Sequence, residues 1–555
     1  MTSFIDRRFR LLALALLLVQ VLVLYVRHSD AGFGFAHDDG LYFSSAKALA
    51  EGKGYVVPSL PGEPAQTKYP PLYSALLSLI WYASPEFPAN LALAFWLNAL
   101  LALGSTGAAI VVTRQLGASR PLALGIATIF ALHPYTIFWA NLVLSDILFA
   151  ALTLGACARA GRALERSHNS FPKWWAAATA LAWLAVLTRS LGIALVAGLA
   201  ASAIWNRRFV AALVAMTASF PVAYSLISKV GGLDVSAGSG YAQNLAYYTS
   251  YLRFWQLSVP SLDAFAAQAG VMLGELLKHP AIACFMLPAT GSASSWLQAA
   301  TITVTAGIVK GAVTSAKTHG WRPIHFTFLF YLPVILIWNY ALMSRFLLPF
   351  VPLFLLGAAV EFGGLWKTIV QTVRSDKPLV DRAVASAMAV VLIGLVGHAG
   401  QRYIWSVPQG LQRMLERRAE IADAKQAAYV WLRENAAAND RVISYEDPSL
   451  YLHSGLQGMR PMSFSTEAFF RKDEAILDRD LARLNETPKE IGAKYWVVSV
   501  DDFANETAEQ EVREAVSELV EQWPAVFTSD DAKVRIHAIR EMSASYWRPS
   551  PYLRY

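Results

Sequence analysis

The chain has 555 residues, of which 55% are hydrophobic and only 16% are charged. Apolar runs of roughly 17–25 residues recur along it, which is the length that an α-helix needs to cross a bilayer. This composition excludes a soluble globular protein. The formal net charge of +7 comes from basic residues between the apolar runs, so it indicates orientation in a membrane rather than nucleic-acid binding. We therefore predict a polytopic α-helical membrane protein with no nucleic-acid partner.

The chain opens with three arginines followed by the apolar run 11–26, with no small-residue cleavage site behind it. This pattern predicts a retained signal-anchor helix with a cytoplasmic N-terminus. The segment 27–90 is then the first external loop. It is expected to contain short helices over 40–51 and 70–82, the second of them interfacial. Between them, residues 52–67 are rich in proline and glycine and are expected to be mobile until substrate arrives.

Further apolar runs alternate in direction through the bilayer and bring the total to about eleven spans. They are expected near 91–113, 121–139, 146–161, 174–188, 191–205, 209–228, 294–316, 324–340, 346–362 and 384–400. Basic residues outnumber acidic ones in the loops that this scheme assigns to the cytoplasm, as the positive-inside rule requires. The residues 1–400 thus form the predicted transmembrane domain, with a second external loop at 229–280. That loop contains aromatics typical of an interfacial belt, namely Tyr241, Tyr247, Tyr248, Tyr251, Phe254 and Trp255.

The tail 401–555 is charged and resembles a soluble domain. Helices are expected near 411–438, 474–485 and 507–522, and strands near 441–445, 494–500, 525–528 and 533–539, with a turn at Asp447-Pro448. Strands that alternate with helices indicate a small external α/β domain. It shows no Cys/His metal spacing, P-loop or dinucleotide fingerprint, so a lid or scaffold over the membrane domain is the simplest role.

Two adjacent acids, Asp38 and Asp39, follow the first span directly. Either can be a solvated loop acid, and either can be a general base that deprotonates an acceptor as it attacks a sugar carbon. Asp146 follows Asn141 and Ser145 at the start of a predicted helix. There a carboxylate also favours the N-terminal dipole, so capping is the alternative role for Asp146.

Three cations are predicted at the external level. Lys68 lies in the first loop, and Arg189 and Arg345 interrupt apolar sequence at the outer ends of spans. Snorkelling explains a single arginine at such a place. Three cations near one acidic site suit a phosphate leaving group. His37 and His133 are weaker site candidates, and Cys157 and Cys284 lie in apolar surroundings that predict packing.

The order of these motifs resembles a family. Asp38-Asp39-x-x-Tyr42, then Lys68-Tyr69-Pro70-Pro71, then Ser145-Asp146, Arg189 and Arg345-Phe346-Leu347-Leu348-Pro349 is similar to the GT-C class of integral-membrane glycosyltransferases. The branch that it resembles contains lipid A aminoarabinose transferases and protein O-mannosyltransferases. The resemblance covers roughly residues 1–400, and an external C-terminal domain is typical of the class.

The resemblance implies roles for individual residues. Asp38 corresponds to the catalytic base, with Asp39 as the second catalytic acid. Lys68 and Arg345 correspond to residues that contact the donor phosphate, and Arg189 joins them by its charge. Tyr42, Tyr69, Asp146 and His133 are the expected substrate-binding residues. The implied donor is a polyprenyl-phosphate sugar, and attack opposite the phosphate inverts the anomeric centre.

Cofactor use has two alternatives. Some related transferases hold a divalent metal ion with such carboxylates, whereas this branch is described without an essential one. If a metal binds, Asp38, Asp39 and Asp146 are the expected ligands.

The expected function is transfer of a sugar to a lipid, glycan or protein acceptor on the external face. The bacterial inner membrane is the expected location, with the C-terminal domain periplasmic. A lipid-linked polysaccharide ligase or polymerase is the nearest alternative enzyme. A transporter is a second alternative, but the chain shows no obvious inverted repeat. A non-enzymatic scaffold or receptor is the third.

Overall fold

The structure is a computed structural model. It describes residues 2–165, 170–220, 239–250, 254, 261–287, 295–338, 344–471, 473–504 and 508–540. Its contacts divide the chain into two compact units, each made of segments distant in the sequence. Unit 1 comprises residues 1–28, 95–224 and 272–413, and unit 2 comprises residues 29–94, 225–271 and 414–555. The predicted domain boundary at residue 400 stays a prediction.

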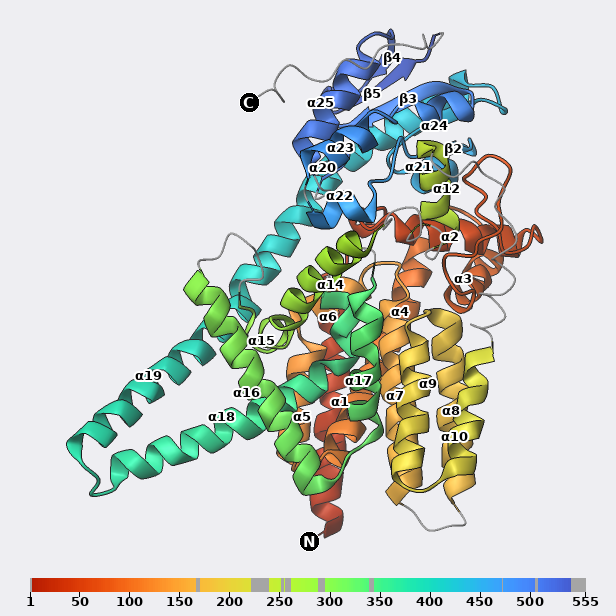
Figure 1. Ribbon diagram of the computed structural model, residues 1–555. Coiled ribbons are helices and arrows are strands. Elements are labelled where there is room, and N and C mark those ends of the chain that lie inside the picture. Colours follow the sequence, from red (N-terminus) through yellow and green to blue (C-terminus); the bar gives the residue numbers. More distant parts are fainter. Residues whose placement is uncertain are drawn as a thin grey trace. The chain divides into compact units, whose positions relative to one another are not determined.

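Unit 1 is helical throughout its described part (Figure 1). Its α-helices are α1 (Thr2–Val26), most of α4 (Leu91–Gln115), α5 (Arg120–Ala131), α6 (Pro134–Ala140), α7 (Asp146–Glu165), α8 (Phe171–Thr188), α9 (Gly192–Trp205), α10 (Phe209–Met216), α15 (His279–Phe285), α16 (Ser295–His319), α17 (Pro323–Leu336), α18 (Val351–Arg374) and α19 (Leu379–Gln401). A 3-10 helix, η3 (Ser344–Phe350), leads into α18. Both cysteines are buried and neither forms a disulfide, which agrees with the predicted packing role.

Six helical segments in the described part of the chain are long and apolar enough to cross a membrane, and the bent pair α5 and α6 makes a seventh. They are Arg7–Val26, Leu91–Gln115, Asp146–Glu165, Ser295–His319, Ser344–Arg374 and Leu379–Asn435. The chain is therefore an integral membrane protein. The predicted spans 191–205 and 324–340 correspond to shorter helices, and parts of 209–228 and 324–340 lie outside the described residues. The count of about eleven stays a prediction.

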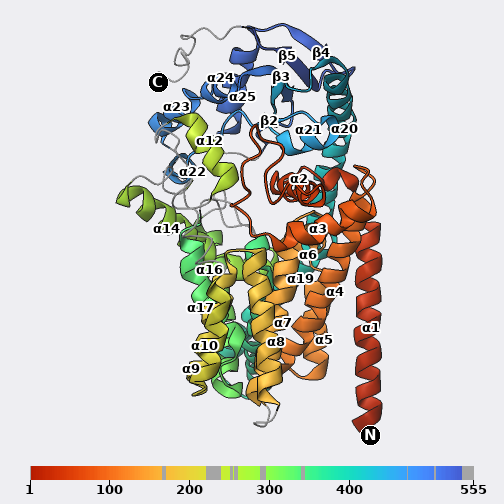
Figure 2. The same ribbon diagram turned by 90° about the vertical axis from the view of Figure 1, so that its right-hand side faces the viewer.

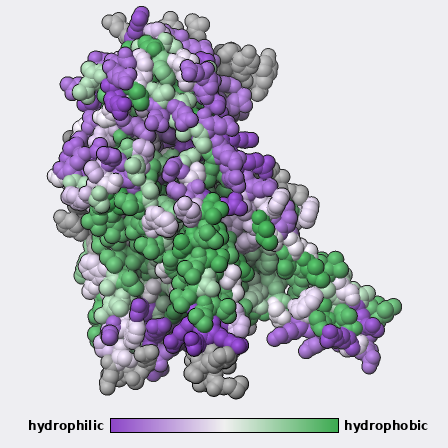
Figure 3. All heavy atoms as spheres, turned by 180° about the vertical axis from the view of Figure 1, so that it is seen from behind, coloured by the Kyte–Doolittle hydropathy of each residue, from purple (hydrophilic) through white to green (hydrophobic). Residues whose placement is uncertain are grey.

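Close helix packing builds unit 1. The helices α7, α8, α9 and α10 stand side by side in both ribbon views (Figures 1 and 2). On another side α16 packs against α18, where a Cβ on Gly311 would overlap the carbonyl of Gly357. Small residues allow such close approach in a bilayer, where dispersion contacts drive helix association. Figure 3 shows hydrophobic side chains gathered over the outer face of the helices of unit 1.

Unit 2 begins with two short helices. The helix α2 (Asp38–Ala50) has two acids in its first turn, and Gly52 follows its end with φ of +74°. Acids favour a helix N-terminus, and a left-handed glycine ends a helix. The helix α3 (Leu72–Ala83) follows Pro70 and Pro71. Both predicted helices are confirmed.

The segment 52–67 between α2 and α3, predicted to be mobile until substrate arrives, has backbone hydrogen bonds within itself and to Gly458. The Val57 N–H donates to the Pro64 carbonyl at 2.8 Å and the Gln66 N–H to the Tyr55 carbonyl at 2.9 Å. Ser59 is buried, and its carbonyl accepts from the Gly458 N–H at 2.8 Å. These backbone hydrogen bonds hold the segment in place.

The C-terminal part of unit 2 is the predicted α/β domain. Its strands are β1 (Arg441–Ile443), β2 (Gly458–Met459), β3 (Ala493–Ser499), β4 (Ala525–Thr528) and β5 (Val534–Ala538), in the order β2-β1-β3-β5-β4. The pairs β1–β2 and β1–β3 are parallel, and β3–β5 and β4–β5 are antiparallel. The remaining helices of unit 2 are α12 (Gly240–Thr249), most of α14 (Leu262–Leu276), most of α20 (Val407–Asn435), α21 (Asp447–Ser454), α22 (Thr466–Arg471), α23 (Glu474–Leu481), α24 (Glu486–Glu490) and α25 (Glu509–Val520). The predicted turn at Asp447-Pro448 is wrong, because α21 begins there.

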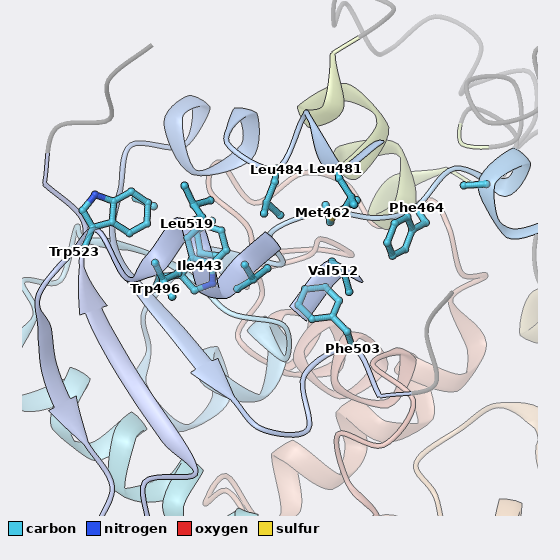
Figure 4. Close-up of a cluster of buried hydrophobic side chains, with 14 residues drawn as sticks. Ile443, Met462, Phe464, Leu481, Leu484, Trp496, Phe503, Val512, Leu519 and Trp523 are labelled. Carbon is cyan, nitrogen blue, oxygen red and sulfur yellow. The ribbon is translucent and has the colours of Figure 1, made fainter. Parts of the chain in front are cut away.

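Alternate side chains of the strands enter two cores, because successive residues of a strand face opposite sides. On one side Trp496 packs with residues of α25 such as Val512 (Figure 4). On the other side the next residue, Val497, packs with residues of α20 such as Leu432. The sheet therefore lies between α20 and α25.

The burial of Trp496 predicts a large stability loss on truncation. Trp496 is only 1% exposed, so Trp496→Ala should lower the free energy of unfolding by about 3–5 kcal/mol. Val500, which is 53% exposed, is the matched control on the same segment. Differential scanning calorimetry in detergent should show a much lower melting temperature for Trp496→Ala than for Val500→Ala. Equal shifts would contradict this account of the core.

Candidate functional site

Asp38 begins α2 and is half-buried. The Tyr69 hydroxyl donates a hydrogen bond to its Oδ1 at 2.5 Å. Tyr42 packs against the Tyr69 ring, with centroids 4.5 Å apart. The Tyr55 hydroxyl donates to the carbonyls of Tyr69 and Pro70, which holds this loop. The structure therefore brings three predicted site residues, Asp38, Tyr42 and Tyr69, into contact.

Asp39 has a different environment from its neighbour. It is fully buried, and its carboxylate accepts from the Gly34 N–H at 2.9 Å and the Gly40 N–H at 2.6 Å. Burial raises the pKa of Asp39 to about 7, against the opposing effects of the Gly40 hydrogen bond and the charge of Arg418. Of the two adjacent acids, Asp38 is the more exposed, and Asp39 holds the loop.

Lys68 lies next to this pair of segments and is 5% exposed. Its Nζ lies 3.8 Å from the centroid of the Tyr247 ring and 5.0 Å from that of Tyr69. Tyr69 thus contacts both the acid Asp38 and the cation Lys68. The carboxylate can accept a proton, and the ammonium group can bind an anion.

Tyr247 and Tyr248 were predicted to lie in an interfacial belt, and this interpretation is wrong. Both are buried in unit 2, and their hydroxyls find partners there. The Tyr247 hydroxyl lies 3.3 Å from Nδ1 of His37, and the Tyr248 hydroxyl donates to Asp447 at 2.6 Å. Of the other belt candidates, Phe254 is buried, and Tyr251 and Trp255 lie outside the described residues. Asp447 carries no local signal of this role in the sequence, apart from the Asp-Pro pair at the start of α21.

A second cluster of charges fastens the first loop to α20. Arg418 of α20 donates to the carbonyls of Ala31 and Phe33 and pairs with Glu446 at 3.1 Å. Lys425, about two turns further along the same face of α20, pairs with Glu446 at 2.8 Å and Asp501 at 2.9 Å. Buried charges need such partners. The loop that carries Asp38 is therefore supported by the C-terminal part of the chain.

Unit 1 contains a separate charged cluster. Asp146 is the first residue of α7 and is 2% exposed. Its Oδ1 lies 2.5 Å from Nη1 of Arg189, and its Oδ2 lies 3.8 Å from Nη1 of Arg345. Both guanidinium groups also lie over the Phe346 ring, at 5.2 and 5.1 Å. The cluster thus places two guanidinium groups beside one buried carboxylate, and guanidinium groups are suited to bind an anion such as a phosphate.

His133, a predicted substrate-binding residue, has both ring nitrogens engaged. Its Nδ1 accepts from the Tyr135 N–H at 3.1 Å as the N-cap of α6, and its Nε2 lies 3.0 Å from the Ala283 carbonyl. In the tautomer that satisfies both contacts, Nε2–H donates to this carbonyl. His133 therefore caps the N-terminus of α6.

A metal ion was the alternative for cofactor use. Among the described residues, no group of three or more His, Cys, Asp or Glu side chains could hold one. Asp39 has both oxygens turned to backbone N–H groups, and Asp38 faces Tyr69.

The fold that the resemblance implies is confirmed by comparison with solved structures. The chain is similar to the crystal structure of ArnT from Cupriavidus metallidurans bound to undecaprenyl phosphate, with 14% identity and a TM-score of 0.51 over 97% of this chain and 98% of that one. AglB from Archaeoglobus fulgidus, in complex with an inhibitory peptide and a dolichol-phosphate, matches at 13% identity with a TM-score of 0.49, over 95% and 74%. No protein-family model matches the sequence, and neither does any curated protein.

The environment of Asp39 predicts a pH dependence of stability. Its pKa of about 7 in the folded protein lies above the ordinary 3.8, so the folded state holds a proton that the unfolded chain releases. Stability from this group is complete below about pH 4 and is lost as the pH rises to about 7, by up to ~1.4 kcal/mol per unit.

Asp39→Asn cannot titrate, so its free energy of unfolding should fall less steeply than that of the parent between pH 4 and 7. Asp502, whose pKa burial also raises to about 7, is unchanged in both proteins and serves as the common background. Denaturant unfolding at several pH values measures the difference. Identical slopes would show that Asp39 does not bind this proton.

Proposed function

We propose that the protein transfers a sugar from a polyprenyl-phosphate donor to a lipid, glycan or protein acceptor, with inversion, on the external face of a membrane. The observation that carries this proposal is the half-buried Asp38 at the start of α2, held by Tyr69, which also contacts Lys68. The GT-C fold supports it, since the ArnT structure was obtained with undecaprenyl phosphate bound.

Asp38 is the proposed general base. As the acceptor oxygen or nitrogen attacks the anomeric carbon, its proton passes to the Asp38 carboxylate. The new bond forms opposite the phosphate, and the bond from the anomeric carbon to the phosphate oxygen breaks. The electron pair of the broken bond stays with the polyprenyl phosphate. The hydrogen bond from Tyr69 fixes the carboxylate for this transfer.

Cations are the proposed ligands of the leaving phosphate. In unit 1, Arg189 and Arg345 lie together beside Asp146, so two guanidinium groups are proposed to contact the phosphate. In unit 2, Lys68 is the proposed phosphate contact. Preorganised cations stabilise charge that develops on a leaving group. Arginine can also grip a phosphate with two parallel hydrogen bonds.

A lipid-borne donor follows from the proposed location. Nucleotide sugars are cytoplasmic, so an enzyme that works on the external face needs a donor delivered by the membrane. We place the protein in a bacterial inner membrane with its N-terminus in the cytoplasm and its C-terminal domain in the periplasm, as the basic inner loops favour.

Comparative mass spectrometry of the cell envelope tests the proposed function and identifies the substrates. Deletion of the gene should remove one sugar from an envelope lipid, glycan or protein, and the parent gene should restore it. Loss of whole polymer chains would identify a polysaccharide ligase or polymerase instead. An unchanged envelope would favour a transporter or scaffold.

The role of Asp38 predicts that Asp38→Asn loses transfer while donor binding persists. Loss of a general base lowers turnover by roughly 10²–10⁴-fold. Binding of undecaprenyl phosphate to the purified variant, followed by its thermal shift, should stay within about threefold of the parent. Asp30→Asn, in the same loop, is the matched control and should keep full turnover. Parental turnover by Asp38→Asn would refute the proposed function.

The role of Arg345 predicts a donor-specific defect. Loss of one charge-assisted contact should raise the dissociation constant for undecaprenyl phosphate by roughly 10–100-fold in Arg345→Ala. The KM for the acceptor should change much less. Arg382→Ala removes an exposed arginine of α19 and controls for the loss of charge. Equal effects on donor and acceptor in Arg345→Ala would count against phosphate binding.

A further inference from the structure

His37, the residue before Asp38, has a strained backbone. Its φ is +49° and its ψ is −40°, and the Ala36 carbonyl accepts from the Asp38 N–H. This is a γ-turn centred on His37, in a conformation that a non-glycine residue adopts only where the surroundings hold it. The turn sets the direction in which α2 begins, and therefore where the Asp38 side chain lies.

The His37 side chain is buried and held at both ring nitrogens. Its Nε2 lies 3.0 Å from Oδ1 of Asp447, and its Nδ1 lies 3.3 Å from the Tyr247 hydroxyl. One tautomer satisfies both contacts: Nε2–H donates to Asp447, and the Tyr247 hydroxyl donates to Nδ1. The imidazole is therefore fixed in orientation as well as in position.

Asp447 is in turn held by its own neighbours. It is fully buried at the first residue of α21, and the Tyr248 hydroxyl donates to the same Oδ1 at 2.6 Å. The Tyr248 hydroxyl accepts from the Arg460 N–H at 2.9 Å. Next to Asp447, Pro448 lies so close to α2 that a Cβ on Gly40 would come within 2.8 Å of it. Asp447, which accepts from His37, is thus held in place by the packing of α21 on α2.

Tyr247 links this pair to the cation of the site. Its hydroxyl contacts His37, and the Nζ of Lys68 lies 3.8 Å from the centroid of its ring. Lys68 also contacts Tyr69, whose hydroxyl donates a hydrogen bond to Asp38. A series of contacts therefore runs from His37 through Tyr247 to Lys68, and on through Tyr69 to Asp38. Because His37 and Asp38 are neighbours in the sequence, the series closes into a ring.

We propose that His37 and Asp447 are a positioning pair that holds the strained turn before Asp38 and so aims the base at the acceptor. Tyr247 extends the pair to Lys68. This inference rests on the proposed function, since it assigns the pair to the same base. A pair of this kind leaves substrate contacts intact, so its loss lowers kcat and not substrate binding.

Steady-state kinetics on the full-length protein, with the donor and acceptor identified from the deletion strain, test the pair. His37→Ala should lower kcat by roughly 10–100-fold, with both KM values within about threefold of the parent. Tyr247→Phe keeps the ring on Lys68 and removes only the hydroxyl, so it should lower kcat by about 2–10-fold. Rates are normalised to folded protein, measured by its thermal unfolding.

A conservative variant separates positioning from simple destabilisation. In Asp447→Asn the amide oxygen can still accept from His37 and Tyr248, so kcat should stay near that of the parent, whereas Asp447→Leu should match His37→Ala. His453, another histidine of unit 2, lies in α21 and packs against Phe87 and Tyr429. His453→Ala should lower stability and leave kcat per folded molecule unchanged.

The Asp38→Asn variant, which lacks the proposed base, is the background that gives the deciding result. If His37 acts through Asp38, adding His37→Ala to Asp38→Asn should cause no further loss of the residual rate. Multiplying losses would overturn the inference, as would parental kcat in both His37→Ala and Asp447→Leu while Asp38→Asn is inactive. Parental turnover by Asp38→Asn would instead overturn the proposed function itself.

Discussion

Burial of charge is the constraint on which unit 2 depends. Arg418 and Lys425 of α20 are largely buried, and Glu446 and Asp501 pair with them at 2.8–3.1 Å. Removing one member would leave its partners charged in a low-dielectric interior, which is far costlier than keeping the pair. Because Arg418 also holds the carbonyls of the first loop, the same constraint that closes the α/β domain fixes the segment that carries Asp38.

The two adjacent acids show how environment separates chemically equal groups. Asp39 is turned to two backbone N–H groups and buried, so it stabilises the loop. Asp38 starts the helix beside it, half-buried, with one oxygen on the Tyr69 hydroxyl. One residue along a helix rotates a side chain by about 100°, which is enough to place one acid inside and the other at the surface.

Unit 1 meets the same electrostatic requirement in a different way. Asp146 lies at the N-terminus of α7, where the helix dipole favours a carboxylate, and two arginines from distant parts of the chain share it. Neither snorkelling nor capping, the simple alternatives for these residues, accounts for all three meeting. Each alternative describes one residue at a time, whereas the cluster depends on how α7 lies against the end of α8 and the 3-10 helix η3.

The sequence by itself determined the membrane class, the helices that flank Asp38, and most strands and helices of the tail, because hydrophobic length and periodicity are local properties. It also determined that Asp38, Lys68, Arg189 and Arg345 are worth attention. Only the tertiary structure decided that Tyr247 and Tyr248 are buried partners rather than a membrane belt, that Asp447 receives His37, and that Asp39 serves the loop. The contacts of His37, Tyr247 and Tyr248 join residues about 200 or more positions apart, and no local pattern encodes which distant side chain will satisfy a buried polar group. The partners of Asp39 are near in sequence, but its burial depends on the packing around the loop.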